Sequence, residues 1–209
     1  MNQTYAIIYN QLDTFNNQFI HKDTMCDILN KFEPKERNTK NILRNLQNQN
    51  KIKYLFNNYF YILTSDEQIK KYYKYSAKEM VFVVLNKLKI KWHLGLYSAL
   101  QINNIDHKND LYHQIPKTTI IINSKFSKTI MVLKQSFIFK KQQHIEVHIE
   151  KAKTNNRITF YYSDLERTHI EYIYYNKASP IDKDILNTNK INKYLNIFQK
   201  KYTINISGL

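Results

Sequence analysis

The sequence predicts an α+β protein in which an N-terminal winged helix-turn-helix precedes a mixed α/β domain with a mainly antiparallel sheet flanked by helices. Three observations indicate this class: apolar residues at helical spacing up to about residue 49, a hairpin pattern after them, and five strand-like runs between residues 115 and 163. We expect residues 1–64 to form the winged helix-turn-helix domain, residues 65–75 a linker helix, and residues 76–209 the larger α+β domain.

The N-terminal part carries the patterns of three helices and a hairpin. Apolar spacing predicts helices over about residues 5–18, 23–32 and 35–49. The runs KIKYLF and YFYILT then flank Asn57 and Asn58, which tolerate positive φ in a two-residue turn. Three helices followed by such a hairpin are typical of a winged helix.

The third predicted helix has one wholly polar side. A rotation of 100° per residue places this side opposite the apolar stripe of Ile42, Leu43 and Leu46. In a winged helix this element enters the major groove, where arginine pairs with guanine and asparagine with adenine, while lysines on the hairpin reach phosphates. An ordinary solvated helix face is the alternative, although the segment 34–56 holds six basic residues and one acidic residue. The predicted DNA-binding residues are Arg37, Lys40, Asn41, Arg44, Asn48, Lys51 and Lys53.

The second part begins with two predicted helices. Ser76 and Glu79 form a capping-box pattern ahead of an amphipathic helix that reaches about residue 88. The stretch 92–102 follows, and we expect it to be helical, with Gly95 near its start. Because a glycine there lets the backbone approach a neighbouring element closely, we interpret Gly95 as a packing residue with no catalytic role.

Strand patterns follow from residue 115 onwards. The runs are KTTIIIN, KTIMVLK, SFIFKK, HIEVHIEK and RITFYYS, and several of them alternate apolar and polar residues as a sheet with one covered face does. Ser163 and Glu166 then predict a capped helix, and a closing helix is expected over about residues 190–202. The predicted breaks between strands fall at Asn123-Ser124, Gln135-Ser136, Gln142-Gln143 and Asn155-Asn156.

Composition points to a polyanionic partner. The formal net charge is +15, and Lys and Arg that neutralise phosphates release counterions on binding. The stretch 117–160 alone has nine basic residues against Glu146 and Glu150, which indicates either a second basic surface for DNA or RNA or a solvated lysine-rich face. Abundant Lys, Asn, Ile and Tyr also fit an A/T-rich genome, which inflates basicity without selection for binding.

The composition also indicates where the protein is located and which cysteine chemistry it excludes. No apolar run is long enough to span a bilayer, and the first residues lack the order of a signal peptide, so we expect a cytoplasmic protein with no membrane partner. Cys26 is the only cysteine, which excludes an internal disulfide and a multi-cysteine zinc site.

A search for catalytic or metal-binding residues leads to the expectation of no enzyme, no metal and no cofactor. His144 and His148 would lie about 13 Å apart on an extended strand, too far to share one ion. Glu146 and Glu150 do not supply the acidic-X-Lys triplet of a restriction-type nuclease, and the sequence has no glycine loop for phosphate. A polar loop without fixed ligand geometry contains the remaining candidates, Asp106, His107, Asp110 and His113.

The segments LGLYSALQINNI, HQIPKTTIII and RITFYYSDLERTHIEYIYY, in this order behind a predicted winged helix, resemble the AbiEi-type antitoxins, which are transcriptional regulators of a toxin-antitoxin and phage-defence system. The resemblance covers the chain from about Asn41 onwards, and Leu165 replaces a proline that is usual in the family. It implies a repressor that binds an inverted repeat in double-stranded DNA at its own promoter. It also implies an antitoxin that neutralises a nucleotidyltransferase toxin without forming a stable complex with it.

Two other functions stay open. One is a protein-interaction module that sequesters a toxin directly, and the other is a nucleic-acid-processing enzyme of the restriction-nuclease type. We interpret Asp164, Glu166 and Arg167 as structural residues, because carboxylates in a first helical turn favour the helix dipole and an arginine one turn on can pair with either of them or reach another acidic neighbour.

Overall fold

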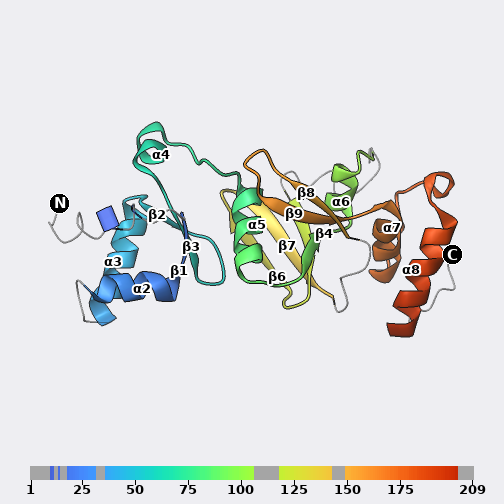
Figure 1. The fold of residues 1–209 in the computed structure, drawn as a ribbon, viewed down its shortest axis with the longest axis horizontal. Coiled ribbons are helices and arrows are strands. Elements are labelled where there is room, and N and C mark those ends of the chain that lie inside the picture. Colours follow the sequence, from blue (N-terminus) through green and yellow to red (C-terminus); the bar gives the residue numbers. More distant parts are fainter. Residues whose placement is uncertain are drawn as a thin grey trace. The chain divides into compact units, whose positions relative to one another are not determined.

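The computed structural model describes residues 10–11, 14, 18–31, 36–105, 118–142 and 149–201, without the side chains of residues 36–38 and 198–201. The chain divides into two compact units, Met1–Leu88 and Lys89–Leu209 (Figure 1). Helices and strands alternate irregularly in both units, which confirms the α+β class. The first predicted helix, over residues 5–18, lies almost wholly outside the described residues.

The first unit contains a three-stranded antiparallel sheet with the strands in the order β1-β3-β2, and helices α2 and α3 share a hydrophobic core with it. Strand β1 lies directly before α2 and was not predicted, because it is only three residues long. The hairpin strands β2 and β3 follow α3, as the sequence predicts. The elements are β1 (Phe19–His21), α2 (Lys22–Asn30), α3 (Glu36–Asn48), β2 (Ile52–Tyr54), β3 (Tyr59–Ile62), α4 (Ser65–Lys70) and α5 (Ala77–Lys87).

The turn of the β2–β3 hairpin is the predicted one. Asn57 and Asn58 have φ of 47° and 61°, and the Tyr59 amide donates to the Phe56 carbonyl at 3.0 Å. Positive φ at both central residues is the geometry that matches the twist of paired strands. A second tie runs from the Lys22 amide to the Asn58 carbonyl at 2.7 Å and joins the hairpin to the start of α2.

The predicted linker is fastened to the first unit by a buried carboxylate. Glu67 of α4 accepts from the backbone amide of Thr64 at 2.8 Å and from that of Lys74 at 2.6 Å. It also accepts from the Tyr61 hydroxyl, and burial together with this hydrogen bond raises the pKa of Tyr61. Segment 65–75 therefore belongs structurally to the first unit, as does α5, whose Ser76–Glu79 capping box is confirmed.

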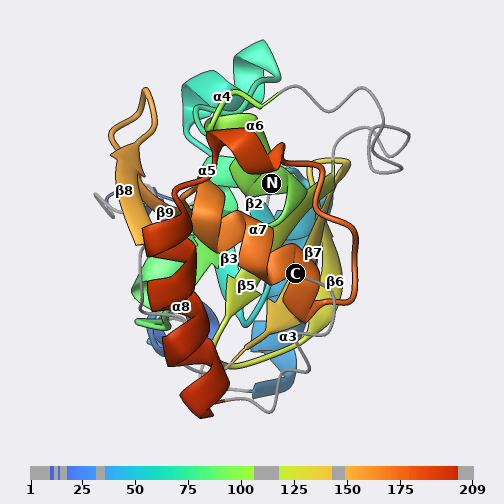
Figure 2. The ribbon, with the colours of Figure 1, turned by 90° about the vertical axis from the view of Figure 1, so that its right-hand side faces the viewer.

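The second unit is a six-stranded mixed sheet with helices α6, α7 and α8. Its strand order is β6-β7-β5-β4-β9-β8, in which β7–β5 and β4–β9 are parallel and the other neighbours antiparallel. Figure 2 shows α7 in front of the sheet with α8 beside it. The elements are β4 (Trp92–Leu94), α6 (Tyr97–Ile102), β5 (Thr118–Asn123), β6 (Lys128–Val132), β7 (Gln135–Lys141), β8 (Ile149–Lys153), β9 (Thr159–Ser163), α7 (Leu165–Tyr174), a 3-10 turn (Lys183–Ile185) and α8 (Thr188–Lys201).

Gly95 is a packing residue, but the predicted helix around it is wrong. Residues 92–94 form strand β4, and the chain then bends through Leu96, whose φ is 51°, before α6 begins. A Cβ on Gly95 would lie 2.4 Å from Ile122 Cδ1 and 2.7 Å from Glu171 Oε2. The close approach is therefore to a neighbouring strand and a buried carboxylate.

Two further predicted boundaries are corrected. The break expected at Gln135-Ser136 lies two residues earlier, at Leu133 and Lys134, which adopt φ of 47° and 64°. The N-cap of α7 is Asp164, not Ser163. Gln135 instead pairs with Val132 in the β6–β7 ladder, and Ser163 pairs with Ile149 as the last residue of β9.

Candidate functional site

Helix α3 has an exposed polar side, although its Thr39 is buried and donates to Asn30 Oδ1 at 3.0 Å. Ile42, Leu43 and Leu46 are buried, and Leu46 joins Met25 and Leu29 of α2 in the core of the first unit. Four predicted DNA-binding residues on the opposite side have exposed side chains: Lys40, Asn41, Arg44 and Asn48. The predicted rotation of this helix is therefore observed, while the side chain of Arg37 lies outside the described residues.

The hairpin continues directly from the end of this helix. The Lys51 amide donates to the Leu46 carbonyl at 2.9 Å, which closes α3 and starts β2. Lys51 itself is half-buried, Lys53 is exposed, and the neighbouring Tyr54 exposes 46% of its surface beside the Phe60 ring. Helix and hairpin therefore form one continuous segment with basic side chains on both elements.

The charges of this segment are mainly positive. From Glu36, the first residue of α3, to residue 65 the sequence holds five basic residues and one acidic residue. A surface of this kind has a positive potential that attracts phosphates over about 8 Å at physiological salt. We call the set Arg37, Lys40, Asn41, Arg44, Asn48, Lys51 and Lys53 the basic segment.

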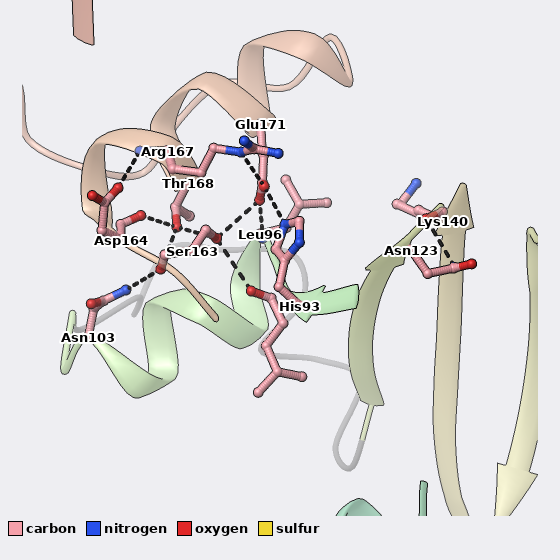
Figure 3. A network of polar contacts seen from close by, with 11 residues as sticks. His93, Leu96, Asn103, Asn123, Lys140, Ser163, Asp164, Arg167, Thr168 and Glu171 are labelled. Atoms are coloured by element: carbon pink, nitrogen blue, oxygen red, sulfur yellow. Dashed lines mark hydrogen bonds and ion pairs between the residues drawn. The ribbon is translucent and has the colours of Figure 1, made fainter. Parts of the chain in front are cut away.

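The second unit contains a polar network of a different kind, shown in Figure 3. The carboxylate of Glu171 on α7 is fully buried and accepts from Arg167 Nε at 2.9 Å and from His93 Nε2 at 2.7 Å. The Ser163 hydroxyl at 3.2 Å and the Leu96 amide at 3.3 Å also donate to it. This carboxylate therefore joins α7 to strands β4 and β9 and to the bend before α6.

The protonation states in this network follow from burial and pairing. Burial lowers the pKa of His93, despite the adjacent carboxylate, so the ring is neutral near pH 7. Burial alone would raise the pKa of Glu171, but the hydrogen bonds from His93 and Arg167 and the positive charge of Arg167 lower it overall. His93 donates through Nε2, and among the described residues its buried Nδ1 has no hydrogen-bond partner.

Asp164 organises the start of α7. It accepts from the Arg167 amide at 2.8 Å, from the Tyr194 hydroxyl at 2.6 Å and from Lys190 Nζ at 2.9 Å. Lys190 also reaches Glu166 Oε2 at 3.2 Å, and the hydrogen bond to Asp164 is the main cause that raises the pKa of Lys190. These contacts attach α8 to α7 and make Asp164 the N-cap of α7, while the Arg167 side chain pairs with Glu171, an acidic neighbour one turn further on.

The side chains at the centre of this network are fully enclosed by the described part of the chain. His93, Arg167 and Glu171 have no exposed surface, and Ser163 is equally buried. Every hydrogen bond of Glu171 given above goes to the chain itself. These contacts hold α7 against strands β4 and β9.

Several residues named from sequence cannot be placed. Asp106, His107, Asp110, His113, His144, Glu146 and His148 lie outside the described residues, whereas Glu150 is exposed on β8. Within the described ranges, no three His, Cys, Asp or Glu side chains gather as metal ligands would.

Comparison with known proteins gives no relative: no family model matches the chain, and no curated protein matches it. None of the helices in the described part of the chain combines the length and apolar character needed to cross a membrane.

Proposed function

We propose that this protein is a sequence-specific DNA-binding repressor, with the basic segment as its contact to the duplex. The single observation that carries the proposal is the exposure of Lys40, Asn41, Arg44 and Asn48 on one side of α3, opposite a buried apolar stripe. A helix fixed in this way on its apolar side leaves its polar side available to a groove.

The order of elements supports a winged helix. A short strand, two helices and a hairpin follow one another as β1-α2-α3-β2-β3, and β1 pairs with the second hairpin strand. In this assignment α3 is the recognition helix and the β2–β3 hairpin is the wing. Arg44 and Asn41 can read base edges, while Lys51 and Lys53 can contact phosphates.

The regulatory part of the proposal rests on the resemblance to AbiEi-type antitoxins. We infer that the target is an inverted repeat at the protein's own promoter and that the second unit neutralises a nucleotidyltransferase toxin.

Binding of a labelled duplex tests the proposal. The duplex spans the region upstream of the protein's own coding sequence, a shuffled duplex of equal composition is the comparison, and fluorescence anisotropy is measured at about 150 mM salt. We expect the upstream duplex to bind at least about a thousandfold more tightly than the shuffled one, which is the lower range for specific sites. Equal affinity for both duplexes would contradict sequence-specific repression.

Substitutions in the basic segment separate base contacts from phosphate contacts. Arg44→Ala should weaken binding to the upstream duplex about 10- to 100-fold and reduce discrimination against the shuffled one. Lys53→Ala should weaken both duplexes alike and lower the slope of log K against log salt by about 0.9. Lys70→Ala, at an exposed lysine on α4, is the matched control and should change neither quantity.

Co-expression tests the antitoxin function. We expect the protein to restore growth of cells that express a nucleotidyltransferase encoded beside it. Arg44→Ala should restore growth equally well, because neutralisation is assigned to the second unit and not to the basic segment. If neither protein restores growth, the antitoxin function is contradicted. DNA binding is tested separately by the anisotropy measurement.

A further inference from the structure

The two edges of the six-stranded sheet differ in how they are protected. Strand β8 has charged, exposed side chains at Glu150, Lys151 and Lys153, which discourage pairing with another strand. Strand β6 at the other edge exposes Thr129 and Met131, and Met131 shows 73% of its surface. An exposed edge with few charges is available for strand pairing.

The backbone of β6 can accept another strand. Val132 pairs with Gln135 across the two-residue turn, so alternation along the ladder directs the bonds of Lys128, Ile130 and Val132 towards β7. The amides and carbonyls of Thr129 and Met131 consequently point away from the sheet. No other described residue bonds to them.

The only charged residue within β6 does not protect this edge as a projecting lysine would. Lys128 is half-buried, and its Nζ lies 4.5 Å from the centre of the Phe126 ring. Exposed lysines instead stand at both ends of the strand, at Lys125 before it and Lys134 in the turn after it. The edge therefore combines an uncharged centre, where the apolar Met131 is exposed, with two positively charged ends.

The charges around β6 indicate which kind of molecule can pair with this edge. Residues 124–141 contain five lysines and no Asp or Glu, so a second copy of β6 would bring like charges together. A nucleic acid would meet outward carbonyl oxygens as well as amides, and carbonyl oxygens repel phosphates. An extended polypeptide supplies a donor and an acceptor for each outward pair, and acidic side chains on it would complement Lys125 and Lys134.

We propose that β6 is a docking edge at which an extended segment of a partner protein, apolar in its centre and acidic at its ends, adds as a seventh strand. The segment pairs with Thr129 and Met131 through the backbone and covers the Met131 side chain. This interaction is separate from the proposed DNA contact, which involves α3 and the β2–β3 hairpin.

A peptide probe tests the docking edge. The probe is a labelled peptide of about ten residues, with valine and threonine in the centre and glutamates at both ends, added to the full-length protein without DNA. We expect saturable binding by fluorescence anisotropy, with at least tenfold weaker binding of the same peptide carrying lysines in place of glutamates. Equal binding of the two peptides, or none of either, would overturn the proposal.

Backbone methylation identifies the mode of binding. Peptides N-methylated at alternate residues in one register lose the amides that bond the edge, whereas methylation in the other register leaves them intact. We therefore expect one series to lose binding and the other to keep it. Equal loss in both registers would show that the peptide binds without strand addition.

Two protein variants locate the site. Met131→Pro removes an outward amide without removing a bond to β7, and should reduce peptide binding at least tenfold relative to Met131→Val. Lys125→Glu with Lys134→Glu should reverse the preference between the acidic and basic peptides. Circular dichroism confirms folding, and loss of duplex binding in Met131→Pro with unchanged peptide binding would assign the edge to DNA and overturn the proposal.

Discussion

The two units use charged helical residues in opposite ways. On α3 of the first unit, Lys40 and Arg44 are exposed while the apolar stripe supplies the core. On α7 of the second unit, Arg167 and Glu171 are fully buried and bonded to each other. Charge on a helix therefore indicates a ligand surface only when burial shows where the charge points, and the same residue types support stability when they are enclosed.

Arg167→Ala should give the largest change in stability. Removing one partner of a buried ion pair leaves the other charge uncompensated and costs about 3–5 kcal/mol. Arg157→Ala is the matched control, because Arg157 is exposed in the β8–β9 turn and should change the free energy of unfolding by less than about 0.5 kcal/mol. Urea unfolding measures both, and equal effects of the two substitutions would remove the contrast between buried and exposed arginines.

Gly95→Ala should have the next largest effect. It should lower the free energy of unfolding by about 1–3 kcal/mol, because the added methyl group overpacks the core. The added methyl group meets Ile122 Cδ1 at 2.4 Å, so Ile122→Val, which removes that atom, should partly rescue the alanine variant. A thermal unfolding series over the wild type, both single variants and the double variant checks this. Strictly additive losses would show that Gly95 matters for another reason.

Acid should weaken the buried network of the second unit. The folded pKa of His93 lies below the unfolded value of 6.5, so the unfolded state binds more protons and stability falls as pH drops below about 6.5. The folded pKa of Glu171 is also lowered, which adds a second loss as pH falls below about 4.5.

His93→Gln isolates the first of these effects, because glutamine keeps a donor for Glu171 and does not titrate. Denaturant midpoints measured between pH 7.5 and 5 should fall for the wild type and change less for the variant. The same slope in both proteins would place the titrating group elsewhere.

Asp164→Ala should have a smaller effect. Loss of the helix cap should lower the free energy of unfolding by about 1–2 kcal/mol. Asp164→Asn keeps a capping oxygen and loses the charge that attracts Lys190, so it should retain most of the stability. If asparagine is as harmful as alanine in urea unfolding, the ion pair with Lys190 matters more than the cap.

The sequence was informative where local chemistry decides the structure. The asparagine turn at 57–58, the Ser76–Glu79 capping box and the polar side of α3 were all predictable, because turn, cap and periodicity are local signals. Strand β1 and the parallel pairs of the second sheet were not, since a three-residue strand has no period of its own and pairing is set by distant residues.

The buried network shows the same limit. Arg167 and Glu171 are four residues apart, so their pairing was within reach of the sequence, but His93 comes from a strand 78 residues earlier in the chain. Gly95 gave a signal of close packing through its rarity, whereas its neighbours Ile122 and Glu171 could be identified only from the fold.

The most direct test compares Arg44→Ala with Arg167→Ala in two assays, duplex affinity and the free energy of unfolding. We predict that Arg44→Ala loses most of its affinity for the upstream duplex while its stability changes by less than about 0.5 kcal/mol. Arg167→Ala should lose stability and, at temperatures where it remains folded, bind the duplex normally. Full duplex affinity in a folded Arg44→Ala protein would contradict the assignment of α3 as the DNA-reading helix.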